Sequence, residues 1–407
     1  MSGDAARTLA TLLVNTAPLW RPAPFHDDPP WVSSTPALTR ALLAFTDAEL
    51  LTLENDPDAL QHCIGNLAPA VAGLQIAAAA CLGHPAAAAV LALPETAGRD
   101  VPGRKWQQVL HFATACGLPC GPVVEWCSGK GHLGRLLARV HGMPVTGIER
   151  DAALCAEGSR LAARAQLDVR FIQADVTRTT ASAAQLVPAS HAIALHACGD
   201  LHVALLRTGS NAGIAAFDIA PCCYHLMRAP HWTPLSQALT ATSLAHLALS
   251  REDLRLAVQE TVTSSPRILR QQRRLAAWRL GFDQLQRELR GVDTYLPTPS
   301  YPLRVLADGC AAFCARLATH HGLTLPAGLD FTRLEQAGSA RLARIRRLQL
   351  LRHACRRPLE VLLVMDRALW LAEQGYAVEV YPFCPRPLTP RNLLIRARRT
   401  EPIPIYP

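Results

Sequence analysis

Lysine is nearly absent from this sequence. The chain has 407 residues and 41 basic ones, yet lysine occurs only at Lys105 and Lys130, so arginine supplies almost all of the positive charge. The formal net charge is +9. The planar guanidinium group of arginine suits phosphate and carboxylate partners, although a GC-rich genome that favours Ala, Pro and Leu would also raise its frequency. The charge therefore allows an acidic partner without requiring one.

Cys-x-x-Cys pairs are also absent, although the chain contains 13 cysteines. Their number is odd, they are scattered through apolar segments, and the N-terminus shows no signal peptide. This pattern excludes the disulfide framework of a small secreted domain and is typical of reduced thiols. We therefore expect a cytoplasmic protein.

Charge is missing from one long segment, residues 64–93, which is rich in alanine. Gly83-His84-Pro85 interrupts it. The composition and the break favour two packed helices over a membrane span. We expect no membrane-spanning segment.

The remaining pattern divides the chain into four parts. Residues 1–100 predict a helical N-terminal region with helices at 5–15, 35–53, 57–81 and 86–93. Residues 101–225 alternate short apolar runs with helical patterns, which is typical of a doubly wound parallel sheet. Residues 226–357 predict an arginine-rich helical insert, which contains 20 arginines and 9 acidic residues. Residues 358–407 predict a last helix and an antiparallel strand pair.

The predicted strands and helices of the sheet follow from the periodicity of apolar residues. Strands are expected at 123–126, 144–148, 169–173, 192–196, 214–219, 377–381 and 393–398. Helices are expected at 133–141, 152–166, 201–211 and 359–374.

The stretch VVEWCSGKGHLG (residues 123–134) contains a G-x-G-x-x-G pattern at Gly129, Gly131 and Gly134. Such a loop after a strand is typical of a dinucleotide site. Glu149 lies 20 positions after Gly129, where an acid would bind a ribose in a dinucleotide or in S-adenosylmethionine alike. The loop alone therefore leaves both cofactors open.

Three other features favour the methyl donor. The carboxylate of Glu125 would attract a cationic amine and repel a pyrophosphate. Asp175 ends the third strand, where it suits the exocyclic amine of adenine. The terminal helix and strand pair match the reversed seventh strand that separates class I methyltransferases from nicotinamide folds. An acid at a strand end is often only a helix N-cap, so the argument depends on all three features.

Six segments carry a closer resemblance: EWCSGKGHLGRLLA, GIER, LHACGDLH, DIAPCCYHL, WTPLS and TPRNLL. In this order they resemble the methyltransferase domain shared by the methyltransferase-like 25 group and the glutathione S-transferase C-terminal-domain-containing group. The glycine loop is also similar to that of the eukaryotic tRNA acceptor-stem ribose methyltransferase. The resemblance covers about residues 102–399. It implies an α/β fold with a Rossmann-like class I methyltransferase sheet and S-adenosyl-L-methionine as cofactor.

The resemblance also implies a donor site. Glu125, Gly129 and Gly131 would line the methionine part, Glu149 the ribose and Asp175 the adenine. The predicted donor residues are Glu125, Cys127, Gly129, Lys130, Gly131, His132, Leu133, Glu149, Arg150, Asp175, Val176 and His196. Cys127 departs from the general pattern, because it stands where the first glycine often lies and a side chain there narrows the approach of the backbone.

An acceptor must reach the donor above the C-terminal ends of the strands. The catalytic candidates there are His196, Asp200, Cys222, Cys223, Tyr224 and His225. A histidine can act as a base near neutral pH or bond to backbone at a strand end. Tyr224 offers a ring on which a planar substrate could stack.

The cysteines of this group allow three interpretations. Cys222 or Cys223, after Pro221, could add to C6 of a pyrimidine, as in RNA cytosine-5 methyltransferases. Both could instead be small buried apolar residues. Cys198, Cys222, Cys223 and His225 are of the types that bind metals, but paired ligand spacing is missing. We therefore expect no metal site.

We expect an S-adenosylmethionine-dependent methyltransferase that acts on RNA, either tRNA or rRNA, at nitrogen or oxygen. The basic stretches 267–290 and 341–358 suit phosphate contacts, and a solvated arginine face explains them equally well. The alternatives are a protein side-chain methyltransferase, an enzyme for a small molecule, an RNA cytosine-5 methyltransferase, a silent adaptor with a methyltransferase fold, and a NAD-dependent oxidoreductase.

Overall fold

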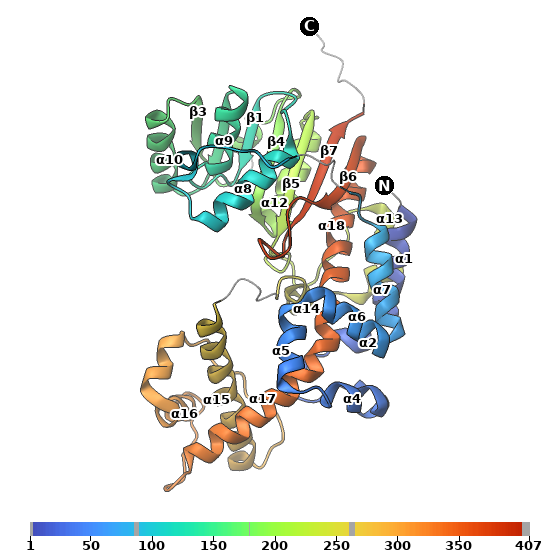
Figure 1. Cartoon of the computed structure of the whole chain (residues 1–407), viewed down its shortest axis with the longest axis vertical. Helices are drawn as coiled ribbons and strands as arrows, with labels where there is room; N and C mark the ends of the chain where they lie inside the picture. The colour runs from blue at the N-terminus through green and yellow to red at the C-terminus, as the bar shows by residue number, and fades with distance from the viewer. Residues whose placement is uncertain (1–2, 85–88, 179, 260–264, 401–407) are drawn as a thin grey trace. The chain divides into compact units, whose positions relative to one another are not determined.

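The structure is a computed structural model that describes residues 3–84, 89–178, 180–259 and 265–400 (Figure 1). The chain divides into two compact units. Unit 1 comprises residues 1–15, 73–260 and 356–407, and unit 2 comprises residues 16–72 and 261–355.

Unit 1 contains a seven-stranded sheet in the order β3-β2-β1-β4-β5-β7-β6. All neighbouring strands are parallel except β7, which runs antiparallel to both β5 and β6. This confirms the expected sheet with a reversed last strand. The strands are β1 (Val123–Trp126), β2 (Val145–Glu149), β3 (Val169–Gln173), β4 (His191–Cys198), β5 (Ala216–Cys222), β6 (Tyr376–Pro382) and β7 (Leu393–Arg399).

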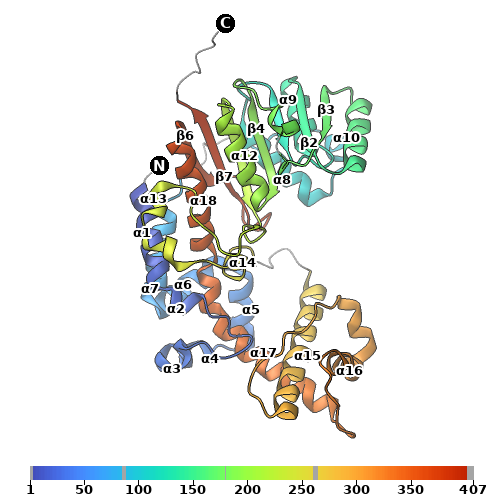
Figure 2. The same ribbon diagram turned by 180° about the vertical axis from the view of Figure 1, so that it is seen from behind.

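Helices cover both faces of the sheet (Figures 1 and 2). Because parallel crossovers are right-handed, the helices that follow β1 and β2 lie on the face opposite the helix that follows β4. The helix before β1 packs against the one that follows β1. The first face carries α8 (Gly103–Cys116), α9 (His132–His141) and α10 (Ala152–Arg164), and the second carries α12 (Asp200–Asn211) and α18 (Arg356–Glu373). The shorter elements of the unit are η1 (Glu95–Gly98), α11 (Thr180–Ala183), α13 (Gln237–Thr240), η2 (Ser243–Leu247) and α14 (Arg251–Leu256).

The boundaries of the units differ from the predicted ones at two places. Helix α1 (Gly3–Asn15) belongs to unit 1, because its buried residues pack against α18. The segment that follows β5 belongs there too, because the buried carboxylate of Asp366 on α18 accepts hydrogen bonds from the Leu235 and Ser236 amides. The insert proper therefore begins near residue 261.

The predicted N-terminal helices are shorter than expected. The helix expected at 35–53 is divided into α4 (Pro36–Leu43) and α5 (Asp47–Asn55), because Thr46 and Glu49 form a capping box that starts a new helix. The helix expected at 57–81 is divided into α6 (Pro57–Leu67) and α7 (Pro69–Ala80). The helix expected at 86–93 is wrong for residues 89–93, which are not helical, and residues 85–88 lie outside the described part.

None of the described helices is long and apolar enough to cross a membrane.

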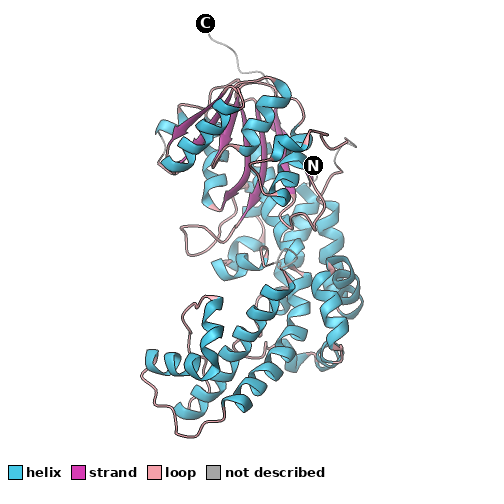
Figure 3. Cartoon of the chain, turned by 60° about the vertical axis from the view of Figure 1, so that its left-hand side comes forward, coloured by secondary structure: helices cyan, strands magenta, loops and turns pink. Residues whose placement is uncertain are grey.

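In its described part, unit 2 is built from helices and loops (Figure 3). Its long helices α15 (Pro266–Arg290) and α17 (Phe331–Ala354) pack closely, since a Cβ at Gly338 would collide with the Ala277 carbonyl of α15. Trp278, Phe282 and Phe313 fill the core beside them. The remaining elements are α2 (Ala17–Trp20), α3 (Trp31–Ser34), α4, α5, α6, η3 (Leu303–Asp308) and α16 (Gly309–His320).

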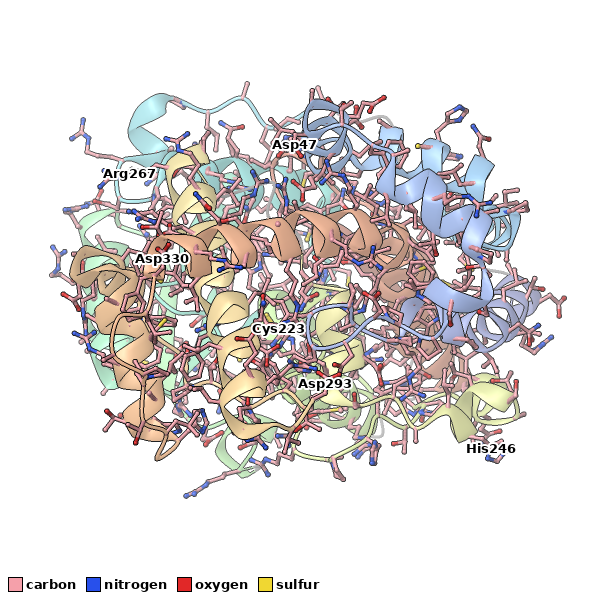
Figure 4. The ribbon with its side chains drawn as sticks, turned by 90° about the horizontal axis from the view of Figure 1, so that it is seen from below. Asp47, Cys223, His246, Arg267, Asp293 and Asp330 are labelled. Atoms are coloured by element: carbon pink, nitrogen blue, oxygen red, sulfur yellow. The ribbon has the colours of Figure 1, made fainter. Side chains whose placement is uncertain are left out.

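Most arginines of α15 and α17 are paired within unit 2. Glu54 of α5 binds Arg273 at 2.7 Å and Arg346 at 2.6 Å. The buried Asp283 binds Arg287 at 3.1 Å and Arg341 at 2.6 Å. Asp47 binds Arg347, and Asp293 binds Arg287; both aspartates are labelled in Figure 4. The basic stretches therefore connect the insert to helices near the N-terminus of the chain.

A buried charge cluster joins three strands of the sheet. Asp218 of β5 is fully buried and contacts His191 Nε2 of β4 at 2.8 Å and Arg398 Nη2 of β7 at 2.8 Å. Burial disfavours the imidazolium of His191, but hydrogen bonds with Asp218 and Cys120 raise its pKa above the usual value. Asp218 therefore compensates the buried His191 and the partly buried Arg398, near the end of the reversed strand β7.

We expect Asp218→Ala to lower the free energy of unfolding by about 3–5 kcal/mol, because it leaves the buried His191 and the partly buried Arg398 without their carboxylate. Urea unfolding measures this value. The control is Glu379→Ala, an exposed position on β6, which should stay within about 0.5 kcal/mol of the parent. A decrease in the free energy of unfolding no larger than that of the control would show that the Asp218 cluster does not stabilise the fold.

Candidate active site

The glycine loop between β1 and α9 is held in a left-handed conformation. The φ angles are 56° at Cys127, 56° at Gly129 and 64° at Gly131. A Cβ at Gly131 would lie 2.5 Å from Cζ of Phe171 on β3. Glycine is therefore required at position 131 by both conformation and space. Cys127 adopts the conformation that a glycine would adopt more easily, consistent with its departure from the general pattern.

Glu149 stands at the end of β2 and faces this loop. Its Oε2 accepts a hydrogen bond from the Gly129 amide at 2.9 Å. Its Oε1 accepts from the Arg150 amide at 2.8 Å and the Asp151 amide at 3.0 Å. The structure therefore brings Glu149 against the glycine loop, while its predicted contact with a ribose remains a prediction.

Glu125 lies beneath the loop. Only 5% of its surface is exposed, and its Oε2 accepts from the Gly134 amide in the first turn of α9 at 3.0 Å. Burial raises the pKa of this carboxyl group to about 7, with the Gly134 hydrogen bond acting in the other direction. Glu125 therefore stabilises the start of α9 and changes its charge near neutral pH.

The other predicted donor residues contribute in different ways. Asp175 accepts from the Thr177 amide and hydroxyl at 2.9 and 2.7 Å, and these hydrogen bonds lower its pKa. Val176 and Leu133 are both buried. Leu133 is part of the hydrophobic core beneath the loop. His132 is partnered by Arg135. Arg150 is exposed and Lys130 is half-buried beside the loop.

His196 lies inside β4 with a φ angle of 73°. Its Nε2 and Gln108 Oε1 of α8 lie 3.0 Å apart. Burial lowers the pKa of His196 to about 4, so the ring is neutral at pH 7 and is a weaker base than the sequence suggested. Sequence reasoning missed Gln108, because nothing in its own helix indicates the contact with β4.

Three cysteines meet at the ends of β4 and β5. Cys198 Sγ lies 3.4 Å from Cys222 Sγ, and the three sulfur atoms of Cys198, Cys222 and Cys223 all lie within 4.8 Å of one another. Hydrogen bonds from the Cys198 and Cys222 thiols lower the pKa of Cys223. Cys222 is only 3% exposed, so Cys223 is the more accessible sulfur for a nucleophilic role.

Tyr224 does not offer a stacking face. The ring is 1% exposed, its hydroxyl donates to the Pro221 carbonyl at 3.1 Å, and the Arg367 guanidinium lies over it at 5.7 Å. The expectation of a planar substrate on this ring is therefore wrong for this conformation. The neighbouring His225 has a buried Nδ1 without a hydrogen bond to any described residue.

A pocket of about 460 Å³ opens beside α12. Its lining includes Val176, Thr177, Asp200, Arg207, Arg228 and His231. Asp200 also accepts from the Arg228 amide at 2.8 Å, which fixes the segment after β5 against the start of α12. The pocket is large enough for a small ligand or one nucleotide, and it is lined by the predicted catalytic residues Asp200 and Tyr224 and by Val176, whereas the glycine loop and Glu149 are not part of its lining.

Unusual backbone conformations gather at this site. Among the described residues, positive φ angles at non-glycine positions occur at Cys127, Gln166, His196, Cys223 and Ala248. Three of these five are predicted site residues. Such conformations cost about 1–3 kcal/mol each and persist where the surrounding structure enforces them, often at functional sites.

Comparisons with known proteins agree with this geometry. Residues 104–230 match the family model described as a methyltransferase domain. The glutathione S-transferase C-terminal domain-containing protein of Xenopus laevis is 31% identical over 128 residues, which cover 30% of this chain and 19% of that protein.

Residues 104–230 are therefore similar to a methyltransferase domain, and the strand order of unit 1 agrees with the sheet expected for a class I methyltransferase. The chain spans about a fifth of the length of its Xenopus relative, so the relative's whole-protein activity is not transferred by this match.

Solved structures of methyltransferases also align, at low scores. A glycopeptide N-methyltransferase bound to S-adenosyl-L-methionine is 18% identical, covers 28% of this chain and 53% of its own, and has a TM-score of 0.22. Geranyl diphosphate C-methyltransferase from Streptomyces coelicolor is 19% identical, covers 34% and 58%, and has a TM-score of 0.22. The strand order of unit 1, not these alignments, carries the fold assignment.

The buried Glu125 predicts that donor binding depends on pH. We expect S-adenosylhomocysteine to bind more tightly as pH rises through about 7, because only the ionised carboxylate attracts the ammonium group of the ligand. Calorimetric titrations from pH 6 to pH 8 measure the change, and Glu125→Gln should flatten it. An unchanged pH dependence in Glu125→Gln would assign the effect to another group.

Proposed function

We propose that the chain transfers a methyl group from S-adenosylmethionine to RNA. The observation that supports the donor half is the contact between the Gly129 amide and Glu149, beside a loop that Gly131 brings close to β3. A bound donor would place its ribose hydroxyls on Glu149 and its methionine part along the loop. S-adenosylmethionine supplies an electrophilic methyl group on a sulfonium, and the chain supplies position and proton transfer.

The acceptor would approach over the ends of β4 and β5, where His196 and Cys223 lie. His196 is neutral, and its contact with Gln108 fixes the orientation of the ring. A low-pKa imidazole is a poor general base at neutral pH. This favours an acceptor that attacks through an existing lone pair, such as an unprotonated ring nitrogen, which takes the methyl group, becomes cationic as neutral S-adenosylhomocysteine leaves, and needs no base.

Charge supports RNA as the acceptor, but with fewer residues than the sequence suggested. Phosphate contacts require accessible cations, and seven of the thirteen arginines of α15 and α17 bind carboxylates within unit 2. Arg267, Arg270 and Arg333 are exposed. Arg267, labelled in Figure 4, stands in the first turn of α15. These three arginines are the proposed phosphate contacts. The competing acceptors are a protein side chain and a small molecule, and the competing role is that of an adaptor that transfers no methyl group.

Calorimetry with S-adenosylhomocysteine, NAD and NADP tests the donor. We expect binding of S-adenosylhomocysteine alone, at micromolar affinity. Glu149→Ala should weaken it by about tenfold or more, because a charged hydrogen-bond acceptor is worth about 1.5–3 kcal/mol. The matched control is Glu288→Ala, an exposed glutamate of α15. Equal effects in the two variants, or binding of NAD alone, would contradict the donor assignment.

Salt dependence tests the acceptor. We expect tRNA binding to weaken as salt rises, and the double variant Arg267→Ala/Arg270→Ala to reduce the slope of log K against log salt by about 1–2, since each lost phosphate contact contributes about 0.7–0.9. Arg7→Ala, on α1 and paired with Asp4, is the control. Radioactive donor then tests for label on the RNA. Tight RNA binding without transfer of the radioactive methyl group would favour the adaptor. A radioactive methyl group found on a protein instead of RNA would show that the acceptor is a protein.

A further inference from the structure

The register of β4 and β5 brings together cysteines that are separated in the sequence. Cys198 lies opposite Cys222 in the parallel ladder, after an irregularity in β4 that follows Leu195. Cys223 continues β5 with a φ angle of 48°, a left-handed conformation that a cysteine rarely adopts. In this conformation the sulfur atom of Cys223 lies near those of Cys198 and Cys222, and all three sulfur atoms are within 4.8 Å of one another.

The spacing of these sulfur atoms suits a metal ion. Zinc binds thiolates at about 2.3 Å in a tetrahedral arrangement, which places ligand sulfurs about 3.8 Å apart. The observed 3.4 Å between Cys198 and Cys222, and the limit of 4.8 Å for the whole set, bracket that value. Among the described residues, no other group of three His, Cys, Asp or Glu side chains lies as close together.

We propose that Cys198, Cys222 and Cys223 together bind one zinc ion as thiolates. Soft sulfur ligands select zinc over magnesium, calcium or manganese. Three thiolates and one Zn²⁺ carry a net charge of about −1, and the guanidinium of Arg391 acts electrostatically on both Cys198 and Cys223. Arg391 therefore offsets the remaining charge.

A fourth position on the ion would remain for another ligand. Three protein ligands with an open position are typical of a zinc site that binds water or substrate, whereas structural sites use four. His225 is the nearest further candidate by sequence, and its buried Nδ1 has no hydrogen bond to a described residue. The site lies beside His196 at the edge where an acceptor is proposed to arrive, but zinc binding does not depend on methyl transfer.

Metal analysis of the full chain, purified without chelator or added zinc, tests the site. We expect about one zinc per chain, and a loss of about tenfold or more in zinc affinity for Cys198→Ser, Cys222→Ser and Cys223→Ser, because even loss of an outer hydrogen-bond partner commonly costs about 10- to 100-fold. Cys310→Ser is the control, since Cys310 and Cys314 form another close pair, 4.0 Å apart. Far-ultraviolet circular dichroism verifies that each variant is folded.

Substitution of cobalt for zinc gives a second measurement. Thiolate-bound Co²⁺ shows a sulfur-to-cobalt charge-transfer absorption whose intensity reports the number of thiolates. We expect the intensity of three thiolates in the parent and in Cys310→Ser, and a loss in each of the other variants. Zinc retained by all variants, an equal loss in Cys310→Ser, absence of the absorption, or a Cys198–Cys222 disulfide in the protein as isolated would each overturn the proposal.

Discussion

The aromatic ring of Phe171 sets the distance between the glycine loop and the sheet. A Cβ at Gly131 or at Gly158 would lie 2.5 Å from its Cζ, and a Cβ at Gly147 would lie 3.1 Å from the same ring. The loop, α10 and β2 therefore all pack on one side chain of β3, each through a glycine. Because protein interiors are close-packed and adjust little, this ring determines where the loop amides stand relative to Glu149.

Two buried carboxylates complete this arrangement at different levels of the sheet. Glu125 holds the first turn of α9 beneath the loop, and Asp218 joins β4, β5 and β7 farther along the sheet. Each carboxylate receives hydrogen bonds that offset part of its desolvation. Glu125 thus fixes the loop from below, and the Asp218 cluster fixes the beginnings of β4 and β5, at the opposite end of these strands from Cys198 and Cys222.

The sequence predicted the parts of the fold that depend on local pattern. Periodicity located all seven strands, and Glu149 ends β2 as expected, whereas Asp175 lies two residues beyond the end of β3. It did not predict Gln108 against His196, and it set aside a metal site at Cys198, Cys222 and Cys223 for lack of paired spacing, because the close approach of these residues depends on strand register and on left-handed residues. The sequence also predicted one helix where the structure has α4 and α5, because the apolar spacing continues across the capping box at Thr46.

The arginines show most clearly why composition is a weak guide to function. Charge counted along the chain marks residues 226–357 as a cationic surface, but the opposite charges lie near the N-terminus, on Glu54, Asp47 and Asp27. Pairing between segments more than two hundred residues apart in sequence is invisible to any local window. A guanidinium already bound to a carboxylate would have to exchange that partner for a phosphate, so the arginines of unit 2 that remain open to an anionic ligand are the exposed ones without a carboxylate partner. The primary role of the basic stretches in this molecule is therefore to hold unit 2 together.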